Sequence, residues 1–325
     1  MHEKLGRLNE IESDNLTLDF SKTTFSDPIA SLFVIRWVDA ARALGVKVTP
    51  HWGSFKEGKR VDDLDEHSRW MFYNGTSGFR SALETGYVAP FEENPKTAGR
   101  YVKYQEIKLD EFRQLREDGD DGAARLSVRN FADSLGTQAF GKSKDVQKFR
   151  RCLAELVENV VWYAGPAARC FVMSQLRPLS APEQEGLFIK GFEAELKLEI
   201  AIADDGVGLL DTLLDSPGVN DHESAIEMAV TPGVSSTQGN DRGFGLALLR
   251  EAAGLGGSMY IATNNDEDAG ALVEVTPDCR PRKIHYPLSG TFVGVSILPQ
   301  LVKLDEIEKR LHAQVGRMHR TLDVN

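Results

Sequence analysis

The sequence lacks long apolar runs, paired cysteines and clusters of basic residues, and each absence excludes a class of protein. No apolar run approaches the roughly 18 residues needed to cross a bilayer, and the start, MHEKLGRLNEIESD, lacks the apolar stretch of a secretory signal. We therefore expect a cytoplasmic protein without a membrane partner.

Cysteine and positive charge are both scarce. The three cysteines, Cys152, Cys170 and Cys279, form no C-x-x-C pair and have no histidine at ligand spacing, so neither a zinc site nor a disulfide framework is expected. The formal net charge is -11, without a cluster of Lys and Arg that could displace counterions from a nucleic-acid backbone. Nucleic acid is not an expected direct ligand.

The 325 residues, 41% hydrophobic and 27% charged, suffice for two domains with buried cores. NLTLDF predicts a strand, the apolar spacing from Ile29 to Leu44 predicts a helix that Gly45 ends, and VKVTP predicts a second strand. Another helix is expected within residues 65–87. This alternation predicts a small layered α/β domain over residues 1–100.

The stretch LDFSKTTFSDP, followed by a helix and GVKV, resembles the STAS-like fold, the regulatory module of anti-anti-sigma factors. In phosphorylatable members the strand–turn–helix corner carries Asp-Ser-Ser or a close variant, whereas here it is Phe25-Ser26-Asp27-Pro28. The resemblance implies a regulatory domain with a protein partner. Ser26 stays open as a regulatory site or as a turn residue that caps the helix.

Residues 101–146 combine the strand-like YVKYQEIKL with the helical ARLSVRNFADSL, and we interpret them as a connector without chemistry of its own. A helix that begins near Asp145 is followed by the strand patterns ELKLEIAIA, SMYIAT, ALVEVTP and TFVGVSIL. Successive strands beside helices predict an α+β layer over residues 147–300.

The helix AELVENVVWYA carries Glu155 and Asn159 four residues apart, on one side. Taken alone, that side is either solvated or faces a ligand. Glu158 projects about a quarter turn away from the edge that they share, and we expect its removal to leave any catalysis nearly unchanged. The opposite side is the predicted buried stripe of Leu153, Leu156, Val157 and Val160.

Two glycine-rich turns lie further along the chain. The strand LEIAIA ends in DDGVGL, which places the carboxylate of Asp204 beside backbone that can approach a flat ring or a phosphate, because glycine has no Cβ. The second turn, QGNDRGFGLALLRE, runs into a helix N-terminus, where unpaired N–H groups favour an anion. Either turn alone is also compatible with an ordinary loop.

The order of these motifs, closed by the strand SGTFVGV, resembles the GHKL ATPase superfamily, which includes gyrase, MutL, sensor histidine kinases and anti-sigma-factor kinases. The resemblance implies an ATP-binding α/β sandwich, the Bergerat fold, over residues 147–300, with ATP and Mg²⁺ as ligands.

Carried over by position, the resemblance implies a role for each matching residue. Asn159 matches the Mg²⁺ ligand, and Glu155 the proposed general base of hydrolytic members. Asp204 matches the carboxylate that accepts a hydrogen bond from the adenine amino group, and Thr291 the threonine that steadies the adenine end. The other nucleotide-binding matches are Gly206, Gly208, Gly239, Gly243, Gly245 and Leu246.

Two further residues keep two interpretations each. Tyr163 either lines the base pocket or belongs to the core. Arg242, just before the phosphate turn, either contacts a phosphate or lies exposed on a lid. The lid itself is expected over residues 211–240, which are rich in Pro, Gly and Ser.

Three functions remain open at this point. The first is an ATP-hydrolysing regulatory switch whose nucleotide state alters contacts with a protein partner. The second is an anti-sigma-type serine/threonine protein kinase, and the third is a non-catalytic nucleotide-sensing adaptor. A histidine kinase is not expected, because residues 101–151 contain no histidine.

Residues 301–325 predict an amphipathic helix. Its apolar stripe packs on its own domain or pairs with a second copy, and we favour a homodimer. The stripe consists of Leu304, Ile307, Leu311, Val315, Met318 and Leu322.

Overall fold

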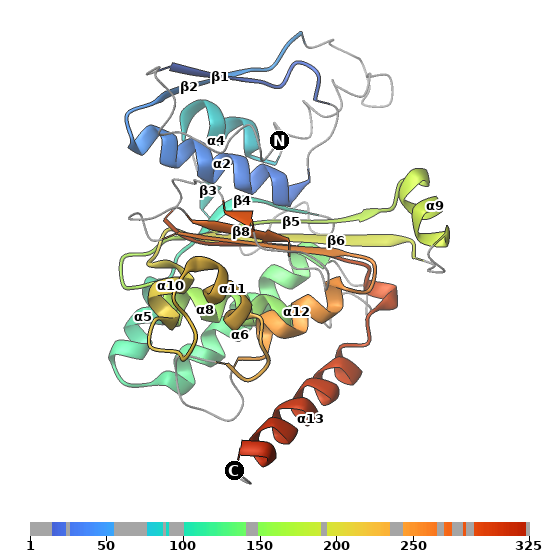
Figure 1. The fold of residues 1–325 in the computed structure, drawn as a ribbon. Coiled ribbons are helices and arrows are strands. Elements are labelled where there is room, and N and C mark those ends of the chain that lie inside the picture. The colour runs from blue at the N-terminus through green and yellow to red at the C-terminus, as the bar shows by residue number, and fades with distance from the viewer. Residues whose placement is uncertain are drawn as a thin grey trace.

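The centre of the protein is an eight-stranded sheet with helices on both faces (Figure 1). The computed structural model describes residues 15–23, 27–54, 77–86, 89–90, 101–140, 149–189, 194–234, 243–264, 270–274, 282–283 and 289–322. The strand order is β3-β4-β5-β6-β10-β7-β8-β9, and neighbours are antiparallel apart from β3 with β4. The predicted α+β class is confirmed.

The predicted strands of residues 147–300 are all present, and two unpredicted strands lie among them, β5 and the two-residue β9. The longer one is β5, whose sequence CFVMSQLRP is buried along most of its length. It therefore lacks the alternation of polar and apolar residues that marks a half-exposed strand. The strands are β3 (Ala89–Pro90), β4 (Tyr101–Ile107), β5 (Cys170–Pro178), β6 (Leu196–Asp204), β7 (Ser258–Asn264), β8 (Ala271–Glu274), β9 (Arg282–Lys283) and β10 (Gly290–Ile297).

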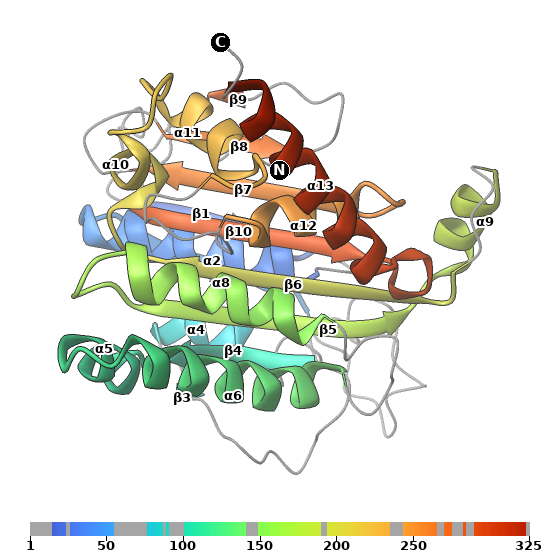
Figure 2. The same ribbon diagram turned by 90° about the horizontal axis from the view of Figure 1, so that it is seen from below.

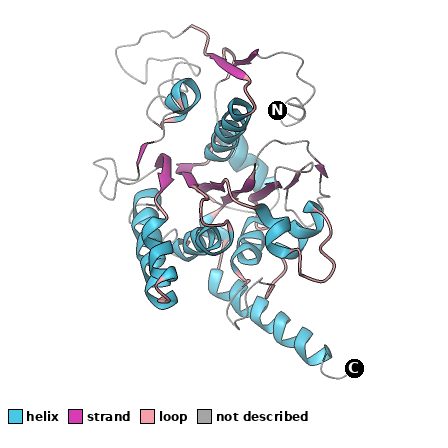
Figure 3. Ribbon diagram, turned by 90° about the vertical axis from the view of Figure 1, so that its left-hand side faces the viewer, coloured by secondary structure: helices cyan, strands magenta, loops and turns pink. Residues whose placement is uncertain are grey.

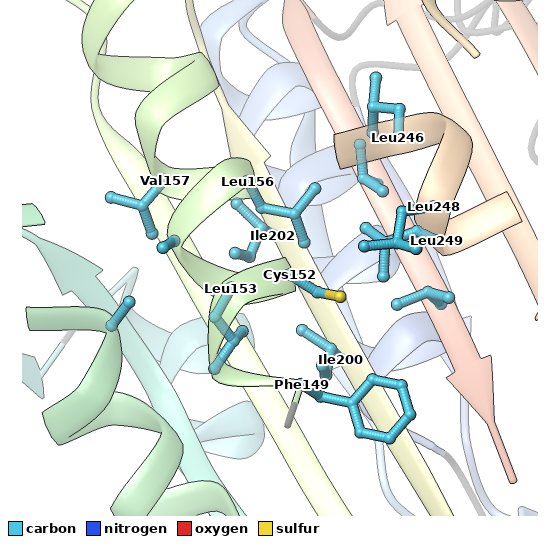
Figure 4. Packing of buried hydrophobic residues seen from close by; sticks show 14 of the residues in the cluster. Phe149, Cys152, Leu153, Leu156, Val157, Ile200, Ile202, Leu246, Leu248 and Leu249 are labelled. Atoms are coloured by element: carbon cyan, nitrogen blue, oxygen red, sulfur yellow. The ribbon is translucent and has the colours of Figure 1, made fainter. Parts of the chain in front are cut away.

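One face of the sheet carries most of the helices, seen from below in Figure 2. The predicted stripe of α8 (Arg150–Tyr163) is confirmed, since its four apolar residues are buried in the main core, where Leu156 lies near Ile202 of β6 (Figure 4). A separate short helix, α9 (Ala181–Ile189), projects between β5 and β6. The helices on this face are α5 (Asp110–Glu117), α6 (Asp121–Phe140), α8 (Arg150–Tyr163), α10 (Gly208–Leu213), α11 (His222–Ala229) and α12 (Gly245–Ala253).

The opposite face is covered by the N-terminal layer, which contains α2 (Pro28–Ala43), α4 (Phe79–Thr85) and the parallel pair of β1 (Asn15–Asp19) and β2 (Lys47–His51) (Figure 3). The Oδ1 atom of Asp27 accepts a hydrogen bond from the backbone N–H of Ala30 at 2.7 Å and caps α2. Asp27 therefore fills the capping role that the sequence left open for Ser26, which lies outside the described residues.

The N-terminal layer and the sheet share one core. The ring of Phe33 on α2 meets the ring of Phe292 on β10 edge to face, with centroids 5.5 Å apart. Tyr104 of β4 and Phe171 of β5 belong to the same cluster of buried side chains. The boundaries expected near residues 100 and 147 thus do not coincide with breaks in the packing, because β3 and β4 are strands of the large sheet.

The C-terminal helix α13 (Leu304–Leu322) follows a short 3-10 turn, η3 (Pro299–Leu301), and lies beside α12 (Figure 2). Leu304, Ile307 and Leu311 are buried in the core of the same chain, so this half of the stripe packs internally. The side chains of Met318 and Leu322 lie outside the described residues. No described helix combines the length and the apolar character needed to span a bilayer.

The shared core predicts that the N-terminal layer and the sheet unfold together. Phe33→Ala should lower the free energy of unfolding by about 3 to 5 kcal/mol, because it leaves a cavity between α2 and β10. In urea, tryptophan fluorescence and far-UV circular dichroism should report one coincident transition at a lower midpoint. Leu44→Ala, at the exposed end of α2, should change stability by no more than about 0.5 kcal/mol. Two separate transitions, with only the first shifted, would contradict the shared core.

Candidate functional site

A cavity of about 630 Å³ opens on the helical face of the sheet, beside the last residue of β6. This volume is typical of small-molecule sites. Gly206 does not line the cavity, and Gly239 and Arg242 lie outside the described residues. The predicted site residues that line the cavity are Glu155, Asn159, Tyr163, Asp204, Gly208, Gly243, Gly245, Leu246 and Thr291.

The carboxyl group of Asp204 lies at the inner end of the cavity, and the residue is only 7% exposed. Its Oδ1 atom accepts hydrogen bonds from the backbone N–H groups of Gly206 at 2.9 Å and Thr291 at 3.2 Å. Within the described residues Oδ2 accepts no hydrogen bond. One oxygen is therefore fixed by the fold while the other remains for a ligand.

Burial raises the pKa of the Asp204 carboxyl to about 7, and the two backbone donors offset part of that rise. The ionised form is disfavoured because the low-dielectric surroundings solvate the charge poorly. A ligand that donates a hydrogen bond to Oδ2 would favour the ionised form and lower this pKa.

The neighbouring acid, Asp205, pairs with arginines. Its Oδ2 accepts a hydrogen bond from Nε of Arg169 at 2.7 Å and lies 3.9 Å from Nη2 of Arg36. Of the two acids in DDGVGL, only Asp204 lines the cavity.

The glycine of Asp-x-Gly at position 206 is required by a close approach of two segments. A Cβ at Gly206 would lie 2.0 Å from the backbone oxygen of Ala164, where α8 ends. The backbone N–H of Val207 donates to that same oxygen at 3.1 Å. The absence of a side chain at Gly206 therefore lets the turn after β6 lie against the end of α8.

At the other end of the cavity, α8 meets the start of α12. A Cβ built on Gly245 would lie 2.7 Å from the Cβ of Glu155 and 3.0 Å from its Oε2, so the carboxylate of Glu155 lies beside the predicted phosphate turn. Asn159 follows one helical turn along α8 and lines the same cavity. The predicted metal and base residues are thus brought together at one end.

The segment expected to be a lid, residues 211–240, contains the end of α10 and all of α11. Asp221 caps α11 through its Oδ1, which accepts from the N–H of Ser224 at 2.7 Å, and Ala225 and Ile226 are buried. Residues 235–242 lie outside the described part. The residues on either side of this gap are close together, since the N–H of Gly233 donates to the backbone oxygen of Gly243 at 3.0 Å.

Tyr163 belongs both to the cavity wall and to the packing of the core. It lines the cavity and also packs, half-buried, against the main core. The aromatic ring therefore joins the cavity wall to the packing beneath it.

One wall of the cavity, which α6 supplies, was not predicted from the sequence. Nη1 of Arg125 donates to Oε2 of Glu158 at 3.4 Å, and its guanidinium lies over the ring of Trp162, 5.1 Å from the centroid. Nε of Arg129 lies 3.8 Å from Oε1 of Glu158. All four residues line the cavity. Glu158 thus lies in the cavity wall, because α6 packs beside α8 on that side of the helix, and the expectation that its removal leaves catalysis nearly unchanged stays a prediction.

A second missed wall comes from α13. Glu308 and His312 line the cavity, and the His312 ring lies 4.2 Å from the ring of Phe244, the residue between the two glycines of the phosphate turn. Only a heptad-like apolar stripe was visible in the sequence, and such a stripe does not show which side chains reach a cavity.

In comparisons with known proteins, no family model and no curated protein matches this chain. The argument for a function therefore rests on the residues of the site.

The raised pKa of Asp204 predicts a pH-dependent stability. Between the ordinary aspartate value of 3.8 and about 7 the folded chain keeps a proton that the unfolded chain has lost. The contribution of Asp204 to the free energy of unfolding must therefore fall as the pH rises through this window, and level off above it. Asp204→Asn should remove that slope. In urea unfolding, the free energy of unfolding of the variant should therefore rise relative to that of the unmodified chain from about pH 5 to about pH 8. Parallel stability curves would contradict the buried, proton-binding carboxyl.

Proposed function

We propose that this chain binds ATP together with Mg²⁺ and hydrolyses it, as a GHKL-type ATPase that regulates a protein partner. The observation that carries the proposal is the Asp204 carboxyl, with one oxygen held by backbone N–H groups and the other available at the inner end of the cavity. A buried acceptor of this kind suits the amino group of adenine. Guanine carries a carbonyl oxygen at the corresponding ring position, which the ionised carboxylate would repel.

The surroundings of Asp204 suit a flat ring. Ile202 of β6 and Val293 of β10 are direct partners across the two strands, and both line the cavity. Leu209 and Leu213 of α10 add apolar surface. An apolar slot with one convergent polar group is the usual composition of a small-molecule site.

The opposite end suits phosphates. The start of α12 presents backbone N–H groups that have no partner within the helix, and Gly243 and Gly245 leave them accessible. The helix dipole adds a partial positive charge at the same place. The length of α8 from Glu155 to Ala164 therefore separates the region suited to phosphates from the region suited to the adenine ring.

Asn159 would hold the Mg²⁺ ion. Its amide oxygen is a ligand type that Mg²⁺ accepts, and at nucleotide sites Mg²⁺ takes one or two protein ligands together with the phosphates. No group of three or more His, Cys, Asp or Glu in the described residues is placed to hold a metal ion. When bound, the ion supplies charge neutralisation at the phosphates.

Glu155 is suited to accept the proton of the attacking water. In hydrolysis, the water oxygen bonds to the terminal phosphorus while the bond from that phosphorus to the bridging oxygen breaks, which gives ADP and phosphate. A carboxylate beside the phosphate turn can take the proton that the water must lose. The resemblance of the N-terminal layer to the STAS-like fold supports a regulatory role with a protein partner.

The decisive variant for hydrolysis is Glu155→Ala. It should keep its affinity for ATP and Mg²⁺, because Asn159, Asp204 and the phosphate turn still make the ground-state contacts. Release of labelled phosphate from γ-labelled ATP should fall by about 10² to 10⁴-fold. Glu185→Ala, at an exposed position on α9, should hydrolyse ATP at the unmodified rate.

Three outcomes would overturn parts of this proposal. Unchanged turnover in Glu155→Ala would remove the catalytic role of that residue. Unchanged affinity for Mg²⁺ and ATP in Asn159→Ala would remove the metal role. Transfer of the label to a protein, in place of free phosphate, would replace hydrolysis with the kinase alternative.

A further inference from the structure

The described wall of the cavity is rich in carboxylates and poor in cations. Its only permanently charged cationic side chains within the described residues are Arg125 and Arg129, both on α6. The carboxylates on the same wall belong to Glu155, Glu158, Asp204 and Glu308. A triphosphate carries several negative charges, so a nucleotide in this cavity needs positive charge from the protein as well as from a metal ion.

The packing of α6 places the two arginines at different levels of the cavity. Arg125 meets Glu158 and Trp162, in the second half of α8. Further along α6, Oγ1 of Thr137 accepts a hydrogen bond from Nη2 of Arg150 at 3.0 Å, at the start of α8. The two helices are therefore antiparallel, side by side in Figure 2. Arg129, one turn beyond Arg125, lies toward the end of α8 where Glu155 meets the phosphate turn.

The two arginines are held to different degrees. The side chain of Arg125 is 26% exposed and lies between the Glu158 carboxylate and the Trp162 ring. The side chain of Arg129 is 67% exposed, and its Nε lies 3.8 Å from Oε1 of Glu158. Water screens the exposed guanidinium of Arg129, and the Glu158 carboxylate, whose side chain is 15% exposed, keeps Arg125 as a partner when Arg129 leaves it. Arg129 can therefore exchange its carboxylate partner for another anion at small cost.

We propose that Arg129 binds the terminal phosphate of the nucleotide and that Glu158 is the counter-ion that it leaves to do so. This inference rests on the proposed ATP-binding function. A guanidinium pairs with phosphate oxygens through two parallel N–H donors, which a single long contact to a carboxylate does not provide. Arg125, stacked on Trp162, stays with Glu158 and positions it. The segment that the sequence presented as a connector is thus a phosphate-binding wall.

The proposal predicts opposite effects for two neighbouring residues. Arg129→Ala removes the phosphate contact and should weaken binding of Mg²⁺-ATP by about tenfold, the loss expected for one charge-assisted hydrogen-bonding group. Glu158→Gln removes the competing anion and a negative charge from the wall, so it should strengthen binding of Mg²⁺-ATP. Neither change should alter the affinity for adenosine, which has no phosphate.

The experiment is calorimetric titration of the full chain with Mg²⁺-ATP, Mg²⁺-ADP and adenosine. Lys309→Ala serves as the control, because it also removes one positive charge but from an exposed position of α13 that does not line the cavity. In Arg129→Ala the loss of affinity for ATP should exceed the loss of affinity for ADP. Lys309→Ala should bind all three ligands with the affinities of the unmodified chain. Thermal unfolding checks that each variant is folded, which is expected because the Arg129 side chain is exposed and Glu158→Gln is isosteric.

Three results would overturn the proposal. The first is an Arg129→Ala variant that binds ATP as tightly as Lys309→Ala does. The second is a Glu158→Gln variant that binds ATP more weakly than the unmodified chain. The third is failure of the unmodified chain to bind adenosine, which would overturn the proposed function and the role of Arg129 with it. Adenosine binding therefore distinguishes a failure of the Arg129 proposal from a failure of the proposed function.

Discussion

Both faces of strand β6 are covered, one by α8 and the other by α2, and its last seven residues are all buried. The strand therefore ends in a carboxylate to which water has little access. The energetic cost appears as the raised pKa of Asp204, since only two backbone N–H groups of the described residues solvate the charge. A ligand that donates to Oδ2 supplies the missing hydrogen bond. The burial that disfavours the ionised group in the free chain thus favours a hydrogen-bond donor when one arrives.

The same packing draws elements from outside residues 147–300 into the site. Arg36 of α2 is buried on the face of the Phe171 ring, 4.2 Å from its centroid, and its Nη2 approaches Asp205 next to Asp204. On the other face, α6 supplies two arginines and α13 supplies Glu308 and His312. The N-terminal layer holds the inner end of the cavity from behind, while α6 and α13 enclose it from the sides.

The sequence predicted the local features of the site and missed those that depend on packing between distant segments. Glu155 and Asn159 share a helix face by their spacing, and Asp204 ends an apolar strand, so local pattern together with the order of the motifs predicted three residues that line one cavity. β5 escaped prediction because burial on both faces removes the alternation that marks a strand. Arg129 and Glu158 meet through the packing of α6 on α8, which no periodicity in either helix reports.

The central claim is that Oδ2 of Asp204 accepts a hydrogen bond from the amino group of an adenine ring. Calorimetric titration with adenosine tests it most directly, because adenosine has the base without the phosphates and depends on neither Glu155, Asn159 nor Arg129. The unmodified chain should bind adenosine, and Asp204→Asn should bind it at least about tenfold more weakly, because a neutral amide is a poorer acceptor than a carboxylate. Equal affinities in the two proteins would contradict the account.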